Sequence, residues 1–246
     1  MSVPLLFTRS SPGRPGSPGR DFPLLYAGDF QPSPARLVNS AGLVSRFINR
    51  PAAAPIARVM RATPLAPAQA IGAALLAAIA AAAMLGAGWN VAAAIVIQAV
   101  NILDSVDDEL ARLRGGATRL GEVLDAVAGR AVESLVIAGL AVHAVRFEDH
   151  PRPEFLGALT LGAVLIVAYS RARIEADLPD VAANPGLDGV FRFAGRDAVL
   201  LVAAIGALVG QCYWALAAIT ALSALTIAWR LLYLRVTIGA RRLPPV

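Results

Sequence analysis

Long apolar stretches dominate the chain from about residue 67 onward. A helix needs roughly 20 mostly apolar residues to cross a bilayer. Six stretches approach that length, at about residues 67–87, 90–110, 120–147, 154–173, 193–212 and 213–234. This pattern predicts an all-α fold, a polytopic membrane bundle of six transmembrane helices.

The residues before these stretches have a different character. Residues 1–36 contain SPGR twice and little apolar content, which is typical of a disordered tail. Residues 37–62 mix apolar side chains with arginines, as an amphipathic helix in the membrane interface does, and Pro51 and Pro55 should bend or divide it. We therefore expect a disordered tail (1–36), an interfacial amphipathic helix (37–62), a six-helix membrane domain (63–236) and a short basic tail (237–246).

Arginines between the apolar stretches gather on one side of the predicted bundle. A cytoplasmic N-terminus places a large group there: Arg58, Arg61, Arg112, Arg114, Arg119, Arg171, Arg173, Arg192, Arg196, Arg235, Arg241 and Arg242. Arg146 and Arg152 fall on the other side. Because cytoplasmic loops carry an excess of basic residues, the chain is expected in the cytoplasmic (inner) membrane, with both termini in the cytoplasm.

Composition supports this assignment. The chain is 57% hydrophobic and 16% charged, with a mean hydropathy of +0.63, which is too apolar for a soluble domain of 246 residues. The formal charge of +5 comes from arginines between apolar stretches, so no nucleic-acid partner is expected. The lone cysteine, Cys212, offers no disulfide framework and no thiol metal cluster. His143 and His150 fall far from the acidic residues and are not expected to be ligands.

Charged residues concentrate at the mouth of the second and third stretches, in DSVDDELARLRGGATRLGEVLDAVAGR. On a helix, Asp104, Asp107 and Asp108 share one face, and the next helix presents Asp125 and Gly129 one turn apart. Ionisable groups inside a membrane helix are costly unless they are paired, hydrated or metal-bound. The charges therefore indicate a polar cavity near the cytoplasmic face.

Two interpretations of these acids stay open from their spacing alone. Oxygen donors on two antiparallel helices, with no His or Cys nearby, suit Mg²⁺ or Mn²⁺. Alternatively, Arg112, Arg114 and Arg119 neutralise the acids at a salt-bridged helix end.

The same segment resembles the signature of the CDP-alcohol phosphotransferase superfamily, D-x2-D-G-x2-A-R-x8-G-x3-D-x3-D. Two positions depart from it: Asp108 stands where the family has Gly, and Gly129 stands where it has the final Asp. YSRARIEA and the arginines that follow are similar to the segment of members that accept phosphorylated polyols, and the nearest subgroup is the di-myo-inositol phosphate phosphate synthase type. The matching signature positions are Asp104, Asp107, Ala111, Arg112, Gly121 and Asp125.

The resemblance implies a membrane transferase. It would move a substituted phosphoryl group from a CDP-alcohol, such as CDP-diacylglycerol, to a polyol or polyol-phosphate hydroxyl and release CMP. The implied partners are this lipid donor, the acceptor, membrane lipids and a second copy of the chain in a homodimer. By position, the implied metal ligands are Asp104, Asp107 and Asp125. Asp108, which departs from the signature, could compensate as a further ligand from the same helix as Asp104. The nucleotide would contact Asp107, Ala111, Arg112 and Gly121, and an acceptor phosphate would be held by Arg171, Arg173, Arg192 and Arg196.

The two departures from the signature, Asp108 and Gly129, leave more than one function open. Gly129 supplies neither the family's general base nor its last metal ligand, and loss of a base typically costs about 10²–10⁴-fold in rate. Glu133, one turn beyond Gly129, is the expected catalytic replacement beside Asp125, with Glu122 as another option. The alternative is a pseudoenzyme of the same fold that acts as a binding or assembly partner. A small transporter, in which the acids line an ion path, is the more distant hypothesis.

Overall fold

The structure, a computed structural model, describes residues 49–60, 67–113, 119–188 and 195–241. These residues are helical and contain no strand, and all of them belong to one compact unit, residues 32–246. The predicted tail over residues 1–36 lies outside the described residues. The elements are α2 (Arg50–Met60), α3 (Pro67–Gly86), α4 (Asn90–Leu113), α5 (Arg119–Phe147), α6 (Pro153–Asp177), α7 (Pro179–Ala182), η2 (Pro185–Leu187), α8 (Arg196–Leu208) and α9 (Cys212–Arg241).

Four of the long helices are long and apolar enough to cross a membrane. These spans are Gln69–Gly86, Asn90–Asp107, Pro153–Asp177 and Cys212–Thr237, on α3, α4, α6 and α9. The first half of α5 carries Asp125, Arg130 and Glu133, which lower its hydropathy. The 13 residues of α8 extend only about 20 Å at the helical rise per residue. The all-α prediction is confirmed, and four of the six predicted spans meet these two criteria.

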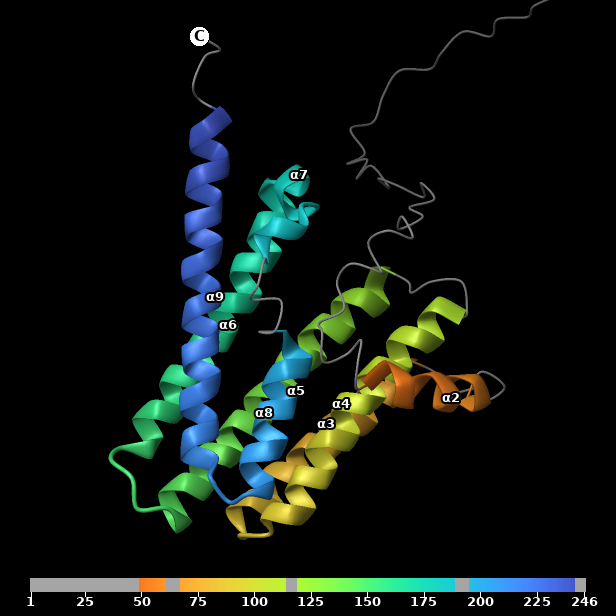
Figure 1. The fold of residues 1–246 in the computed structure, drawn as a ribbon. Helices are drawn as coiled ribbons and strands as arrows, with labels where there is room; N and C mark the ends of the chain where they lie inside the picture. Colours follow the sequence, from red (N-terminus) through yellow and green to blue (C-terminus); the bar gives the residue numbers. More distant parts are fainter. Residues whose placement is uncertain (1–48, 61–66, 114–118, 189–194, 242–246) are drawn as a thin grey trace, which may run out of the picture. The chain divides into compact units, whose positions relative to one another are not determined.

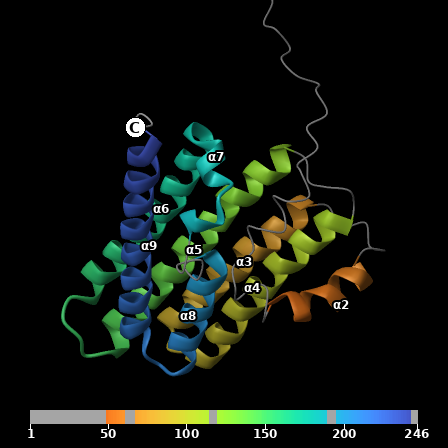
Figure 2. The same ribbon diagram turned by 45° about the horizontal axis from the view of Figure 1, so that its top comes forward.

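The helices α4 and α5, which carry the residues of the signature segment, are held in place by packing on the same two neighbouring helices. Both pack on α3 and on α8, whereas α4 and α5 make little direct contact along their described residues. α6 packs on α9 and α5, and α9 lies beside α6 in both ribbon views (Figures 1 and 2). Leu85, Ile97, Leu140, Leu200 and Leu216 are fully buried in the apolar core that joins these helices. This arrangement leaves the facing sides of α4 and α5 available for polar residues.

Small residues let the helices approach closely. Gly139 on α5 faces α3, and a Cβ added there would lie 2.8 Å from the Cα of Ala82. Such small residues are typical of helix interfaces in membranes, where close backbone contact replaces the hydrophobic driving force.

The short helix α2 packs against α4 through alanines. Ala53 and Ala57 are buried beside Val106, while Val59 on the opposite side is 76% exposed. The helix continues through Pro55, so this proline does not divide it. Only part of the predicted interfacial segment, residues 37–62, falls within the described residues.

The close α3–α5 contact yields a stability prediction. Gly139→Ala should destabilise the fold by about 1–3 kcal/mol, because its methyl group would overlap the α3 backbone. Thermal unfolding of the purified protein in detergent measures this change. Gly72→Ala on α3 is the matched control, since an added Cβ there meets no atom within 4 Å. Equal melting temperatures for the two variants would contradict the packing described here.

Candidate active site

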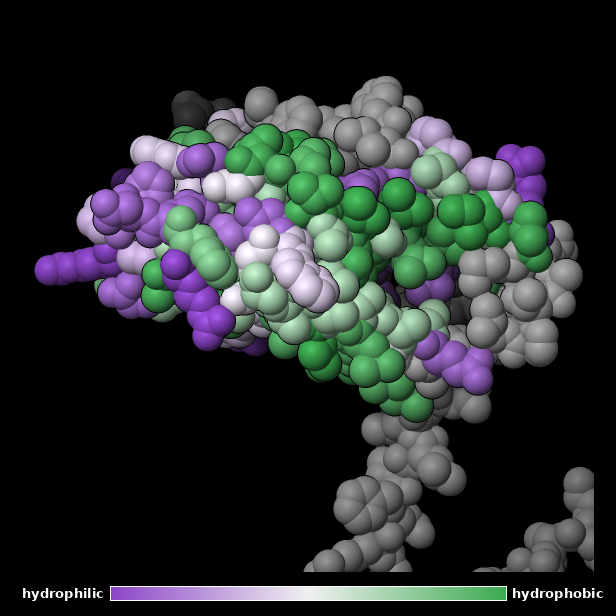
Figure 3. Space-filling view, turned by 90° about the horizontal axis from the view of Figure 1, so that it is seen from below, coloured by the Kyte–Doolittle hydropathy of each residue, from purple (hydrophilic) through white to green (hydrophobic). Residues whose placement is uncertain are grey.

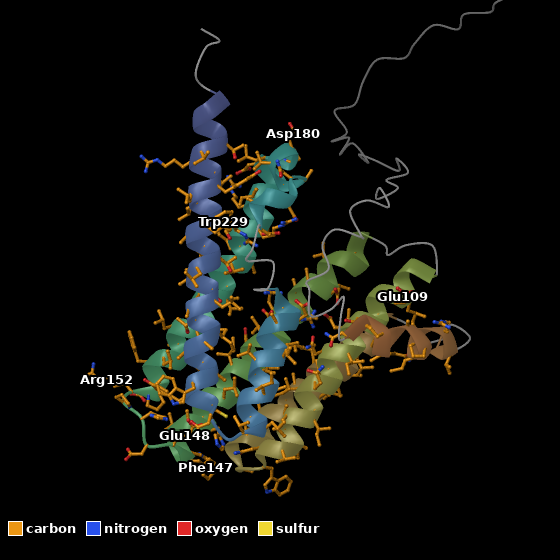
Figure 4. All side chains as sticks on the ribbon, viewed as in Figure 1. Glu109, Phe147, Glu148, Arg152, Asp180 and Trp229 are labelled. Atoms are coloured by element: carbon orange, nitrogen blue, oxygen red, sulfur yellow. The ribbon has the colours of Figure 1, made fainter. Side chains whose placement is uncertain are left out.

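The signature residues gather at one end of the helical unit. In Figure 1 the C-terminal half of α4, the N-terminal half of α5 and the start of α8 are the upper parts of those helices, and the C-terminal half of α6 rises above them. Glu109, on α4, marks this end among the labelled side chains of Figure 4. The helices that the sequence predicts to carry the acids and the acceptor-binding arginines therefore reach the same region.

Asp104 on α4 forms an ion pair with the first residue of α8. Its Oδ1 lies 2.6 Å from Nη1 of Arg196, and the two side chains are 26% and 15% exposed. A charge-assisted contact of this length between partly buried groups is strong. The sequence assigned Arg196 to an acceptor phosphate, so this pairing with a signature acid is a feature that spacing alone did not reveal.

A buried amide network fixes the position of α8 relative to α4. Asn101, one turn before Asp104, donates from Nδ2 to the backbone oxygen of Asp197 at 3.1 Å. Its Oδ1 accepts a hydrogen bond from Nδ2 of Asn49 at 3.0 Å, and Gln98 donates to Asn49 at 3.3 Å. Because Asn101 and Asn49 are almost fully buried, these hydrogen bonds hold the start of α8, and with it Arg196, beside Asp104.

Arg196 also fills the space beside Gly129. A Cβ added at Gly129 would lie 2.6 Å from Nη1 and 3.0 Å from Cζ of Arg196. The family signature has an aspartate at this position, and such a side chain would require the guanidinium to move. The departure at residue 129 and the position of Arg196 are therefore linked.

Glu133, the proposed replacement base, is buried one turn further along α5. Its side chain is 1% exposed, and its Oε2 lies 2.5 Å from Nη1 of Arg130. Arg130, itself partly exposed, is therefore the ion-pair partner of this buried carboxylate. Arg196 and Asp104 lie within electrostatic range of this carboxylate. A carboxylate has about four acceptor positions, so a buried carboxylate with this one ion-pair partner is suited to hold a cation or a substrate hydroxyl as well.

The other signature residues that the structure describes differ in their exposure to solvent. Asp125 on α5 is exposed and interacts electrostatically with Asp104 across the gap between the helices. Asp107 and Gly121 are partly buried. Several predicted site residues, or their side chains, lie outside the described part of the chain: Asp108, Ala111, Arg112, Glu122 and Arg192.

The two arginines predicted on α6 already have acidic partners. Arg171 contacts Glu175 at 2.6 Å and also pairs with Asp188 after η2. Arg173 pairs with Asp177 at 2.8 Å on an exposed surface. The structure therefore brings Arg196, but not these side chains, into contact with a signature acid.

Sequence reasoning missed the acid that organises this second group. Asp188 accepts from Nη2 of Arg230 on α9 at 2.9 Å, and Arg230 also donates to the Val167 carbonyl oxygen at 2.6 Å. Trp229, labelled in Figure 4, donates to the Gly186 carbonyl oxygen at 3.2 Å. No periodic signal marks Asp188, because it lies in a short turn between elements. The network joins α6, η2 and α9 at the site's end of the unit.

Comparisons with known proteins agree with this geometry. The family model for CDP-alcohol phosphatidyltransferase matches residues 68–229. A Rubrobacter xylanophilus protein named bifunctional IPC transferase and DIPP synthase is 35% identical over 198 residues, covering 79% of this chain and 43% of that protein. The phosphatidylinositol phosphate synthase of Mycolicibacterium smegmatis is 32% identical over 114 residues, covering 46% of this chain and 48% of that protein.

A solved structure shares the helical arrangement. The crystal structure of Mycobacterium tuberculosis phosphatidylinositol phosphate synthase with CDP-DAG bound aligns with a TM-score of 0.62 and 26% identity, over 79% of this chain and 98% of that one. The chain spans less than half the length of the two relatives described above. Since the family match extends from α3 into α9 and includes the whole signature segment, the chain belongs to the CDP-alcohol phosphatidyltransferase family.

Proposed function

We propose that this chain is a membrane transferase that moves a substituted phosphoryl group from a CDP-alcohol, such as CDP-diacylglycerol, to a polyol or polyol phosphate. The single observation that carries the proposal is the ion pair between Asp104 and Arg196, which joins α4 to α8 beside Gly129 of α5 within the family signature. In the reaction, an acceptor hydroxyl oxygen bonds to the donor phosphorus. The phosphorus–oxygen bond to CMP breaks, CMP leaves with the electron pair, and the hydroxyl proton passes to a base.

Mg²⁺ or Mn²⁺ is the cofactor we propose for this site. The oxygen donors of Asp104, Asp107 and Asp125, with Asp108 as a further ligand, are of the type that hard divalent cations prefer. Two observations support the fit: Asp104 and Asp125 lie within electrostatic range of each other on separate helices, and the buried carboxylate of Glu133 lies within electrostatic range of Asp104. When bound, such an ion would neutralise the pyrophosphate and polarise the phosphorus.

Arg196 sets a condition on metal binding. Among the described residues, the oxygens of Asp104, Asp107 and Asp125 do not all lie within 4.8 Å of one another. One Asp104 oxygen is instead paired with Arg196. We propose that Arg196 releases Asp104 when the ion binds and then turns to the acceptor phosphate, which guanidinium groups bind well. Arg171, Arg173 and Arg192 complete the proposed acceptor set.

Glu133 and Asp125 are the proposed catalytic residues. Gly129 has no side chain that accepts a proton, and the buried carboxylate of Glu133, paired with Arg130, lies one turn further along the same helix. The nucleotide is proposed to contact Asp107, Ala111, Arg112 and Gly121. Residues of this kind hold the donor while the base acts on the acceptor hydroxyl.

The membrane topology we propose has six spans with both termini in the cytoplasm. The observed bounds of α3, α4, α5, α6, α8 and α9 coincide closely with the six apolar stretches of the sequence. Arg196 and the α6 arginines lie at the same end as the signature acids, which agrees with a cytoplasmic site under the positive-inside rule. The interfacial segment over residues 37–62, the homodimer and the inner-membrane location belong to the same proposal.

A catalytically impaired member of the family is the second candidate. It is favoured by one observation: the place of the family's final aspartate is taken by Gly129, with the Arg196 guanidinium beside it. Restoring the signature with Asp108→Gly and Gly129→Asp distinguishes the two. Turnover that appears only in the restored protein supports the impaired form, whereas turnover that the restoration reduces supports an active, rearranged site.

CMP release tests the proposed transferase directly. Purified protein in detergent, supplied with CDP-diacylglycerol, Mn²⁺ and an inositol phosphate, should release CMP. Asp125→Asn and Glu133→Gln should each lower the rate by at least about 100-fold, the scale for loss of a base or of several kcal/mol of charge stabilisation. Asp180→Asn, on the exposed start of α7, is the control and should keep the full rate. Unchanged turnover in Glu133→Gln would rule out Glu133 as the base.

Removal of Arg196 tests its competition with the metal. Arg196→Gln should tighten Mn²⁺ binding severalfold, because a partly exposed pair contributes about 1 kcal/mol and every 1.4 kcal/mol is a factor of about ten. The same change should raise the KM for a polyol-phosphate acceptor. Electron paramagnetic resonance of free Mn²⁺ measures the first effect without turnover. Weaker Mn²⁺ binding in this variant would show that Arg196 supports the metal site instead of competing for it.

A further inference from the structure

A second polar cluster lies at the end of the unit opposite the signature acids. There the α3–α4 turn, the end of α5, the α5–α6 connection and the start of α9 meet, and Figure 4 labels Glu148 at this lower end. Figure 3 looks onto this end and shows hydrophilic residues gathered at one edge beside a broad hydrophobic surface. The carboxylate of Glu148 accepts hydrogen bonds from the backbone nitrogens of Cys212 at 2.6 Å and Tyr213 at 3.0 Å.

His143 points one ring nitrogen toward this carboxylate. The ring is 3% exposed, and its Nδ1 lies 3.0 Å from the carbonyl oxygen of Leu85. A carbonyl oxygen only accepts hydrogen bonds, so Nδ1 carries the proton and Nε2 keeps its lone pair. Nε2 lies 3.9 Å from Oε1 of Glu148. A histidine held by a backbone carbonyl in this way has the orientation that metal-binding histidines adopt.

Cys212 completes a set of three different ligand atoms. Its side chain is fully buried, and the ligand atoms of His143, Glu148 and Cys212 all lie within 4.8 Å of one another. A nitrogen, an oxygen and a sulfur donor together suit Zn²⁺ and similar transition cations, whose affinity for thiolate and imidazole exceeds that of Mg²⁺ or Mn²⁺. No pattern in the sequence marks this cluster, because its members are separated by up to 69 positions along the chain.

A further buried polar atom lies beside His143, on a residue that also lines a cavity. The Oδ1 atom of Asn90 is buried and has no hydrogen-bond partner, while its Nδ2 lies 3.4 Å from Nε2 of His143. Asn90 also lines a cavity of about 440 Å³ together with Gly88, Trp89 and Gly210. An unpartnered buried oxygen beside three potential ligands is suited to a fourth ligand position or to a metal-bound water.

We propose that His143, Glu148 and Cys212 form a binding site for Zn²⁺ or a similar transition cation, separate from the acidic site. On binding, the Cys212 thiol loses its proton to solvent and its sulfur bonds to the metal. Because the ligands come from α5, the α5–α6 connection and the start of α9, the ion joins these elements at that end of the unit.

Binding of Co²⁺, a spectroscopic substitute for Zn²⁺, tests the site in the purified full-length protein. Unchanged protein should bind one Co²⁺ here and show a thiolate-to-cobalt absorption band. Cys212→Ser should remove the band, and His143→Gln should weaken binding by at least about tenfold. Zn²⁺ should raise the melting temperature of the unchanged protein more than that of Cys212→Ser.

Two control variants show whether the cobalt band arises from these three ligands. Asp125→Asn should keep the band, because the acidic site lies at the other end of the unit. Asp180→Asn should also keep it, since Asp180 lies on the exposed start of α7 and is not one of the three ligands. Absence of the band in the unchanged protein, or a band that persists in Cys212→Ser, would overturn the proposal. Neither outcome depends on whether the protein releases CMP.

Discussion

A carboxylate in a helix long enough to cross a membrane is costly unless it has a partner. Asp104 lies within such a stretch of α4, and its partner is Arg196 at the start of α8. The buried amide of Asn101 fixes this register by holding the backbone of Asp197. Because Arg196 also lies against Gly129 of α5, one guanidinium joins the three helices that form the candidate site.

The two ends of the helical unit carry different chemistry. Carboxylates and a guanidinium meet at the end that holds the family signature, and this combination suits a hard divalent ion, a pyrophosphate and an acceptor phosphate. The opposite end combines imidazole, carboxylate and thiol, which favour a softer cation. The apolar core between them, which includes Leu85 and Leu140, keeps the two polar groups apart.

The sequence predicted where the helices lie better than it predicted which side chains pair between them. Hydropathy predicted the all-α fold and the four helices that are long and apolar enough to span a membrane, because this signal depends on residues close together in the chain. The pairing of Asp104 with Arg196 links positions 92 apart, and nothing local specifies it. Pro55 was expected to bend or divide its helix, and α2 continues through it undivided, with Ala53 and Ala57 packed on α4. Tertiary packing outweighed the local preference there.

Joint binding of one divalent ion by α4 and α5 is the central claim, and Mn²⁺ titration followed by electron paramagnetic resonance tests it most directly. Purified protein should bind Mn²⁺, and binding should be lost in both Asp104→Asn, on α4, and Asp125→Asn, on α5. Full binding in either variant would contradict a site shared by the two helices.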